Sequence, residues 1–86
     1  MKYFKQGDDL FKISKFKEAI KSYDKCIALN PNHSDAYFKK AHSLFRLDRY
    51  QEALDYLNKS LKIDESNLDA LNYKGICLQF INKDDE

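Results

Sequence analysis

Residues 3–19, YFKQGDDLFKISKFKEA, return 34 positions later as YFKKAHSLFRLDRYQEA at residues 37–53. The same register continues further along the chain, where Asp69 aligns with Asp35. A fixed period of this length indicates one structural unit stacked on copies of itself. Such a stack offers a long shared surface that suits the binding of another chain, whereas catalytic sites grow from non-equivalent loops around one core. The repeat therefore favours an interaction protein and disfavours an enzyme.

The apolar pattern divides each period into two helices. Apolar residues recur at intervals of three and four, which is typical of amphipathic helices. Polar residues interrupt this pattern inside each unit, at residues 14–15 and again at 48–49. A fifth apolar segment, residues 68–81, begins a third unit, and nothing in the chain suggests a strand. The sequence thus predicts an all-α fold in one domain, 1–86, with repeat one at 1–33, repeat two at 34–67, and a half repeat or capping helix at 68–86.

Capping pairs mark the starts of later helices. Asn32 with Asp35, and Ser66 with Asp69, have the spacing of an N-cap residue and the third residue of its helix. The turn inside the second unit carries the same spacing, beginning at Asp48. We expect Asn32, Ser66 and Asp48 to cap the helices that follow them.

The composition limits the kinds of partner. The 86 residues carry 15 Lys plus Arg against 14 Asp plus Glu, which gives a formal net charge of +1. Charge so nearly balanced provides no electrostatic basis for binding nucleic acid or an anionic membrane. No apolar run approaches the roughly 20 residues of a membrane span, and the start of the chain does not resemble a signal peptide. We expect a cytoplasmic protein that contacts neither membranes nor nucleic acid.

The cysteines and histidines show no pattern of a reactive site. Cys26 and Cys77 stand singly, without the CxxC or histidine spacing of metal sites, and we expect both to be reduced and apolar in role. His33 lies between two units and His42 lies on a first helix, and we expect both to be solvated surface residues. The sequence therefore predicts no metal, no cofactor and no catalytic residue.

The residues at fixed places in each unit carry a family resemblance. They alternate small and bulky types in a common register: Tyr3, Gly7, Leu10, Ala19, Tyr23, Cys26 and Pro31 in the first unit; Tyr37, Ala41, Leu44, Ala53, Leu57, Ser60 and Glu65 in the second; Leu71, Gly75 and Leu78 in the third. This pattern resembles the tetratricopeptide repeat. The departures are Gln6, Lys40 and Lys74 in place of the usual leucine, and Glu65 in place of proline. The resemblance implies an all-α, right-handed helix-turn-helix solenoid of about two and a half repeats.

Small residues are expected where paired helices cross. Gly7, Ala41 and Gly75 occupy equivalent places in the first helix of each unit, and Ala19 and Ala53 lie in the second helices. We expect the two sets to face each other, because small side chains let two backbones approach closely.

The resemblance also implies that the first helices line a concave groove that binds a peptide or partner protein. Carried over by register, the groove residues are Phe4, Asp8, Phe11, Lys12, Asp35, Phe38, Lys39, His42, Phe45, Arg46, Asp69, Asn72, Ile76, Gln79 and Phe80. The phenylalanines would supply apolar pockets, and the cations would favour acidic residues in the ligand. The alternative for the phenylalanines is packing between neighbouring first helices. The alternative for the protein is a structural or regulatory segment of a larger enzyme or assembly, and single-stranded RNA binding is a third hypothesis.

One ligand class is expected not to bind. Many proteins of the family that this chain resembles bind the acidic C-terminal tail of heat-shock chaperones through a clamp of lysine, asparagine, asparagine, lysine and arginine. At those places this chain has Phe4, Asp8, Lys39, Asp69 and Tyr73. Only one of these side chains is a cation, and two are carboxylates that repel a carboxylate ligand. We therefore expect no specific binding of such a tail.

The last residues place Glu86 in register with Glu18 and Glu52, which lie in second helices. The third unit therefore has no second helix in this sequence. We expect either a fragment of a longer array or a fifth helix that serves as a cap, with self-association possible through that helix.

Overall fold

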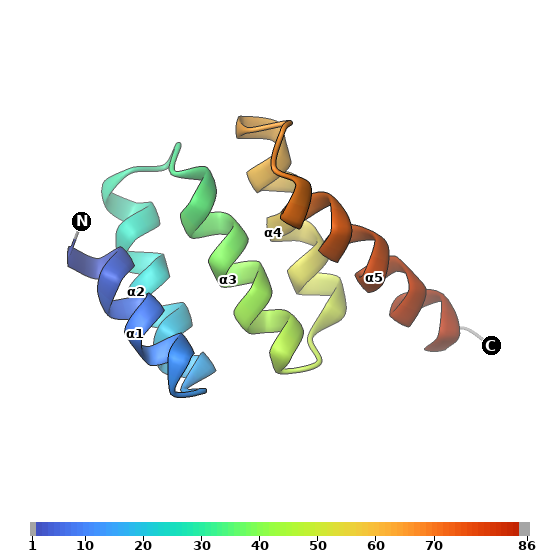
Figure 1. The fold of residues 1–86 in the computed structure, drawn as a ribbon, viewed down its shortest axis with the longest axis horizontal. Helices are drawn as coiled ribbons and strands as arrows, with labels where there is room; N and C mark the ends of the chain where they lie inside the picture. Colours follow the sequence, from blue (N-terminus) through green and yellow to red (C-terminus); the bar gives the residue numbers. More distant parts are fainter. Residues whose placement is uncertain (1, 85–86) are drawn as a thin grey trace.

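The structure, a computed structural model, describes residues 2–84 and is built from five helices. They are α1 Lys2–Lys12, α2 Phe16–Leu29, α3 Ser34–Arg46, α4 Tyr50–Ile63 and α5 Leu68–Asp84. Successive helices run back and forth across the molecule (Figure 1). The all-α prediction is confirmed, and Glu86, whose register suggested a missing helix, lies outside the described residues.

Each helix packs mainly on its neighbours in the chain, as a solenoid requires. The contacts run from α1 to α2, α2 to α3, α3 to α4 and α4 to α5, with smaller contacts between α1 and α3 and between α3 and α5. The buried residues are mostly small or medium-sized, with Tyr23, Leu44 and Leu57 the largest of those almost fully covered. The first helices α1, α3 and α5 therefore lie side by side along one face of the stack (Figure 1).

The turns inside the first and second units share a backbone conformation. Ser14 and Asp48 both adopt a left-handed conformation, with φ of 63° and 62°, and they are register equivalents. Short polar side chains tolerate this region better than most residues. The prediction that Asp48 caps α4 is wrong: the N-cap residue is Arg49, without a side-chain cap bond, and Asp48 accepts a hydrogen bond from the Tyr50 hydroxyl at 2.8 Å.

The caps of α3 and α5 lie one residue beyond the predicted ones. His33 Nδ1 accepts from the Ala36 amide at 3.1 Å, and Asn67 Oδ1 accepts from the Ala70 amide at 3.0 Å. The predicted cap Ser66 instead donates its hydroxyl to the Asp64 carboxylate at 2.7 Å. The caps are again register equivalents, so the repeat extends to helix capping, although Asn32 and Ser66 do not perform it.

Lys40, which stands where the resemblance implied leucine, connects three helices. Its ammonium lies 2.6 Å from the Asp24 carboxylate on α2 and 3.9 Å from the centre of the Tyr56 ring on α4. Burial opposes the charge of Lys40, but Asp24 and Tyr56 outweigh it, so the pKa of Lys40 is raised. A charged side chain thus takes part in packing where the resemblance implied leucine.

The helix crossing at Gly7 differs from the expectation of two facing small residues. An added Cβ at Gly7 would lie 2.6 Å from the ring of Tyr23, and its three nearest neighbouring atoms all belong to that ring. Ala19, the predicted facing residue, is fully buried but is not the closest neighbour. Gly7 therefore makes room for a tyrosine ring.

Candidate functional site

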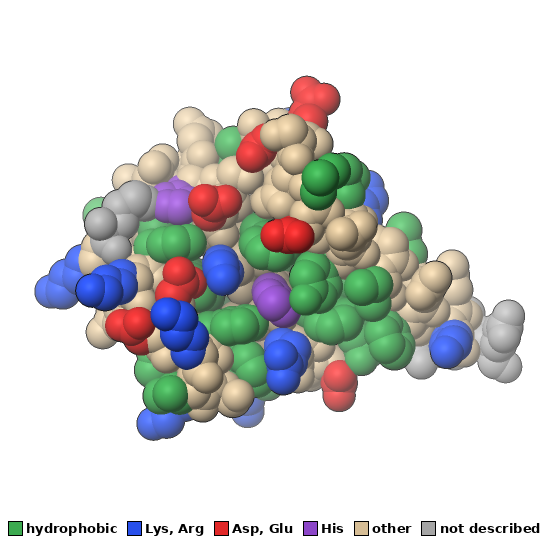
Figure 2. All heavy atoms as spheres, in the orientation of Figure 1, with side chains coloured by type: hydrophobic (Ala, Val, Ile, Leu, Met, Phe, Trp, Pro, Cys, Tyr) green, Lys and Arg blue, Asp and Glu red, His purple; other side chains and the backbone are tan. Residues whose placement is uncertain are grey.

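A groove with a volume of about 500 Å³ lies on the face formed by α1, α3 and α5. It is lined by Phe4, Asp8, Asp35, Phe38, Lys39, Asp64, Asn67 and Asp69. Figure 2 shows this face, with acidic side chains gathered mainly over its upper middle part and basic ones mainly along its left and lower sides. Six of the lining residues were predicted from the register. Asp64 and Asn67 were missed because they belong to the connection before α5 and its cap, outside the first helices.

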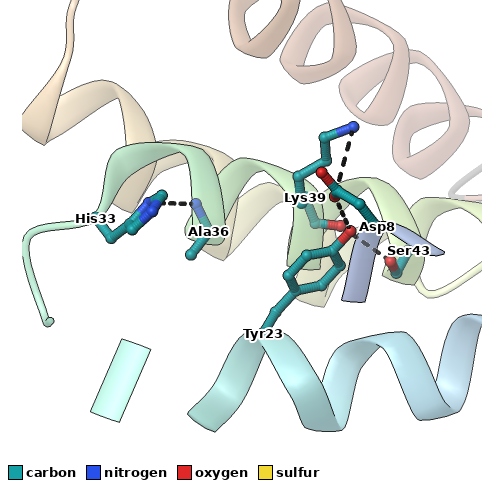
Figure 3. Close-up of polar contacts among 6 residues, drawn as sticks. All are labelled: Asp8, Tyr23, His33, Ala36, Lys39 and Ser43. Carbon is teal, nitrogen blue, oxygen red and sulfur yellow. Dashed lines mark hydrogen bonds and ion pairs between the residues drawn. The ribbon is translucent and has the colours of Figure 1, made fainter. Parts of the chain in front are cut away.

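Asp8 is held in place by a hydrogen bond and an ion pair to Tyr23 and Lys39 (Figure 3). The hydroxyl of Tyr23, on α2, donates to Asp8 Oδ1 at 2.5 Å, and Lys39 Nζ lies 3.9 Å from the same oxygen. Burial and then the bond to Asp8 raise the pKa of Tyr23, so its hydroxyl remains a donor. The single cation of the groove therefore already faces a carboxylate.

Phe38 and Phe45 pack between α3 and α5. Phe38 is only 9% exposed and belongs to the core, and its ring centre lies 6.0 Å from that of Tyr73. Phe45 is partly buried against the same core and lies 5.3 Å from Tyr73 and 6.1 Å from Phe80. Of the two roles considered for these rings, the geometry favours packing.

Phe4 and Phe11 are only partly buried. Phe4 stacks on His33 with ring centres 4.9 Å apart, and it lines the groove. Phe11 lies edge-on to Phe16 at 5.2 Å and tilts against His42 at 4.7 Å. Phe4 is therefore the phenylalanine best placed to contact a ligand.

His42 is surrounded by aromatic rings, so the prediction of a solvated surface histidine is wrong for it. Its ring centre lies 4.7 Å from Phe11, 5.9 Å from Phe38 and 4.5 Å from Tyr73. Burial lowers the pKa of His42 to about 4, with further lowering by nearby Lys39 and Arg46 and a smaller opposing effect of Asp69. The imidazole is neutral at physiological pH and acts as part of the aromatic packing.

This burial predicts an acid-sensitive fold. Because the pKa of His42 is near 4 in the folded state and near 6.5 when unfolded, the unfolded chain binds the proton more tightly. The contribution of His42 is fully present above pH 6.5 and is lost as the pH falls towards 4. We expect a loss of about 1–2 kcal/mol over this range, since the ring keeps partial contact with water. Denaturant titrations at pH 7 and 4.5 should show it, and the His42→Phe variant should lose less. Equal losses in both proteins would contradict the role of His42.

The remaining predicted site residues lie outside the lining of the groove. Lys12, Asn72, Ile76 and Gln79 are exposed on α1 and α5. Arg46 lies with its guanidinium carbon 5.1 Å from the centre of the Phe16 ring, at the other end of α3. The groove thus contains fewer cations than the sequence led us to expect.

The described part of the chain contains no group of three or more histidine, cysteine or acidic residues arranged to hold a metal ion. None of its helices is both long and apolar enough to cross a membrane.

A comparison with protein families shows the family of the chain. A family model for the tetratricopeptide repeat matches residues 4–68. The protein therefore belongs to the tetratricopeptide repeat family. A search of curated protein sequences gives no match.

Solved structures of this family share the fold. The second TPR of Spaghetti (RPAP3), bound to the HSP90 peptide SRMEEVD, has a TM-score of 0.92 and 23% identity over 95% of this chain and 76% of that one. The first TPR of Spaghetti, bound to the same peptide, has a TM-score of 0.91 and 25% identity over 94% of this chain and 64% of that one. The TPR2B-domain:pHsp70 complex of yeast Sti1 has a TM-score of 0.91 and 23% identity over 95% of this chain and 66% of that one. The chain therefore spans between about two thirds and three quarters of these domains.

Proposed function

We propose that this protein is an interaction module whose groove binds a peptide segment of a partner protein. Membership of the tetratricopeptide repeat family supports this, as do solved relatives that are described with bound peptides. The groove between the first helices offers the space, with a volume of about 500 Å³. Phe4 provides an apolar wall that is not fully used by the core.

The ligand, in this proposal, carries basic side chains. The observation that supports this proposal is the charge of the groove, whose lining has four aspartates and a single lysine. That lysine, Lys39, already faces Asp8, so the remaining carboxylates are not balanced within the groove. Opposite charge on the ligand speeds association and rejects like-charged competitors. This replaces the sequence-based expectation of acidic ligand residues, and it agrees with the expectation that acidic chaperone tails do not bind.

The test compares two peptides of matched length. One alternates leucine with lysine and arginine, the other has glutamate at each basic position, and both are titrated by calorimetry together with SRMEEVD. We expect the basic peptide to bind at least tenfold more tightly than either acidic one, with affinity that falls as salt rises. The double substitution Asp35→Asn and Asp69→Asn should weaken the basic peptide about fivefold or more.

A control substitution outside the groove tests the effect of a surface aspartate elsewhere on the molecule. Asp55 is exposed on α4 and does not line the groove, so Asp55→Asn should leave binding unchanged. Tight binding of SRMEEVD that disappears with Lys39→Ala would contradict the basic-ligand proposal. Binding of neither peptide class would contradict the groove as the peptide site.

A further inference from the structure

Asp8 lies in the lining of the groove with a loosely held cation beside it. Both Asp8, on α1, and Lys39, on α3, line the groove. Lys39 Nζ lies 3.9 Å from Asp8 Oδ1, which is longer than a hydrogen bond, and the side chains of Lys39 and Asp8 are 32% and 28% exposed. Ion pairs in contact with water contribute little to stability. A ligand can therefore open this pair easily.

The Asp8 carboxylate is fixed in orientation but only partly used. The hydroxyl of Tyr23, a fully buried residue, donates to Oδ1 at 2.5 Å. Among residues 2–84, no donor is hydrogen-bonded to the second oxygen, Oδ2. An ionised carboxylate can accept about four hydrogen bonds. Asp8 therefore keeps acceptor capacity for a ligand in the groove that it lines.

Lys39 competes within the chain with any cation that approaches Asp8. A ligand lysine that displaces Lys39 replaces one ammonium by another, so the exchange brings no net gain. An arginine offers more, because its planar guanidinium can donate two parallel hydrogen bonds to the two oxygens of a carboxylate. The presence of Lys39 therefore favours arginine over lysine as the ligand residue that binds here.

Lys39 has a second favourable place when it leaves Asp8. Its ammonium lies 5.4 Å from the centre of the Phe11 ring, within the range of a cation–π contact. The Lys39 side chain is also in contact with water. Displacement by a ligand therefore does not leave a buried, unpaired charge.

We propose that Asp8 is the subsite for an arginine side chain of the ligand and that Lys39 makes this subsite reject lysine. The proposal rests on the proposed function, since it requires that the groove binds a basic peptide segment. The guanidinium binds the Asp8 carboxylate, and the Lys39 ammonium turns towards Phe11. Phe4 lies one turn before Asp8 on the same side of α1 and also lines the groove, so the arginine stem packs along its ring.

Two peptides of equal length and charge test the selection. Both alternate leucine with basic residues, which are all arginine in one peptide and all lysine in the other. Calorimetric titration into the chain should show that the arginine peptide binds about fivefold more tightly or better. With Lys39→Gln the lysine peptide should gain about fivefold, because it no longer displaces an ammonium, and the preference should fall to about twofold.

Two further variants complete the test. Asp8→Asn should weaken the arginine peptide about fivefold or more and remove the preference for arginine. Its melting temperature should change little, because the asparagine oxygen can still accept from the Tyr23 hydroxyl. Lys21→Gln removes the same charge as Lys39→Gln from an exposed position on α2 that does not line the groove, so it should leave the preference unchanged.

The outcomes separate this proposal from the proposed function. Equal binding of the two peptides to the unsubstituted chain would contradict the arginine subsite and leave the peptide groove intact. A preference that keeps its full size with Lys39→Gln would contradict the role of Lys39. Binding of neither peptide would overturn the proposed function and the subsite with it.

Discussion

The substitution Phe38→Ala is expected to lower the free energy of unfolding by about 3–5 kcal/mol, the usual cost of removing a buried aromatic ring. Phe38 is 9% exposed and contacts His42 and Tyr73, so its loss leaves a cavity between α3 and α5. A domain of this size is stable by only about 5–10 kcal/mol, so the variant should lie close to unfolding. Denaturant unfolding followed by circular dichroism at 25 °C measures the effect.

The matched control is Phe4→Ala, at the equivalent place one repeat earlier. Phe4 is only partly buried and lies against His33 and the rim of the groove, so we expect a loss of about 1–2 kcal/mol together with weaker peptide binding. If Phe38→Ala instead costs less than about 1 kcal/mol and abolishes peptide binding, the ring is a ligand anchor and its assignment to the core is wrong.

The positions of the helices and of the turns inside each unit could be predicted from the sequence, because they depend on a repeated local pattern. Apolar spacing and the 34-residue register indicated every helix, and the polar breaks at residues 14–15 and 48–49 fall in the observed turns. The precise cap residues could not be predicted, because several consecutive residues before α3 and α5 have side chains able to accept an amide hydrogen bond. Which of them caps the helix depends on the path of the loop, as Asn67 and His33 show.

The burial of the predicted site residues and the charge of the groove depend on contacts between repeats. The 34-residue register alone does not give these contacts. Phe38 and Phe45 have the spacing of an exposed row, but Tyr73 from the third unit covers them. The sequence pattern predicted His42 to be a surface residue, but Phe11 of the preceding first helix packs against it. The acidity of the groove was underestimated for a similar reason, since Asp64 enters it from a connection between repeats.

The α5 helix differs from the other helices in a way that its sequence signals only weakly. Its exposed apolar residues include Leu71, Ile76, Leu78 and Phe80, and they are distributed around the helix. A helix that is apolar on several sides is normally buried on several sides. Sequence periodicity shows such a helix but does not show which of its sides is left uncovered.

The two glycines are expected to respond in opposite directions to the same substitution. Gly7→Ala places a methyl group 2.6–2.9 Å from three atoms of the Tyr23 ring. That ring is fully buried and its hydroxyl is bonded to Asp8, so it cannot move aside freely. Overpacking costs about 1–3 kcal/mol, and three ring atoms this close place Gly7→Ala in the upper part of that range, at about 2–3 kcal/mol. This exceeds the roughly 1 kcal/mol that alanine contributes over glycine in a helix.

Gly75→Ala brings the same gain in helix propensity without the clash, because no atom beyond the adjacent residues and the backbone of its own helix lies within 4 Å of the added Cβ. It should raise the free energy of unfolding by about 1 kcal/mol, so the two variants should differ by about 2–3 kcal/mol. Parallel thermal and denaturant unfolding of both variants measures this difference. Equal stabilisation by the two substitutions would show that Tyr23 does not press on Gly7. A loss of stability at Gly75 that depends on protein concentration would instead show that α5 is already covered by a second copy.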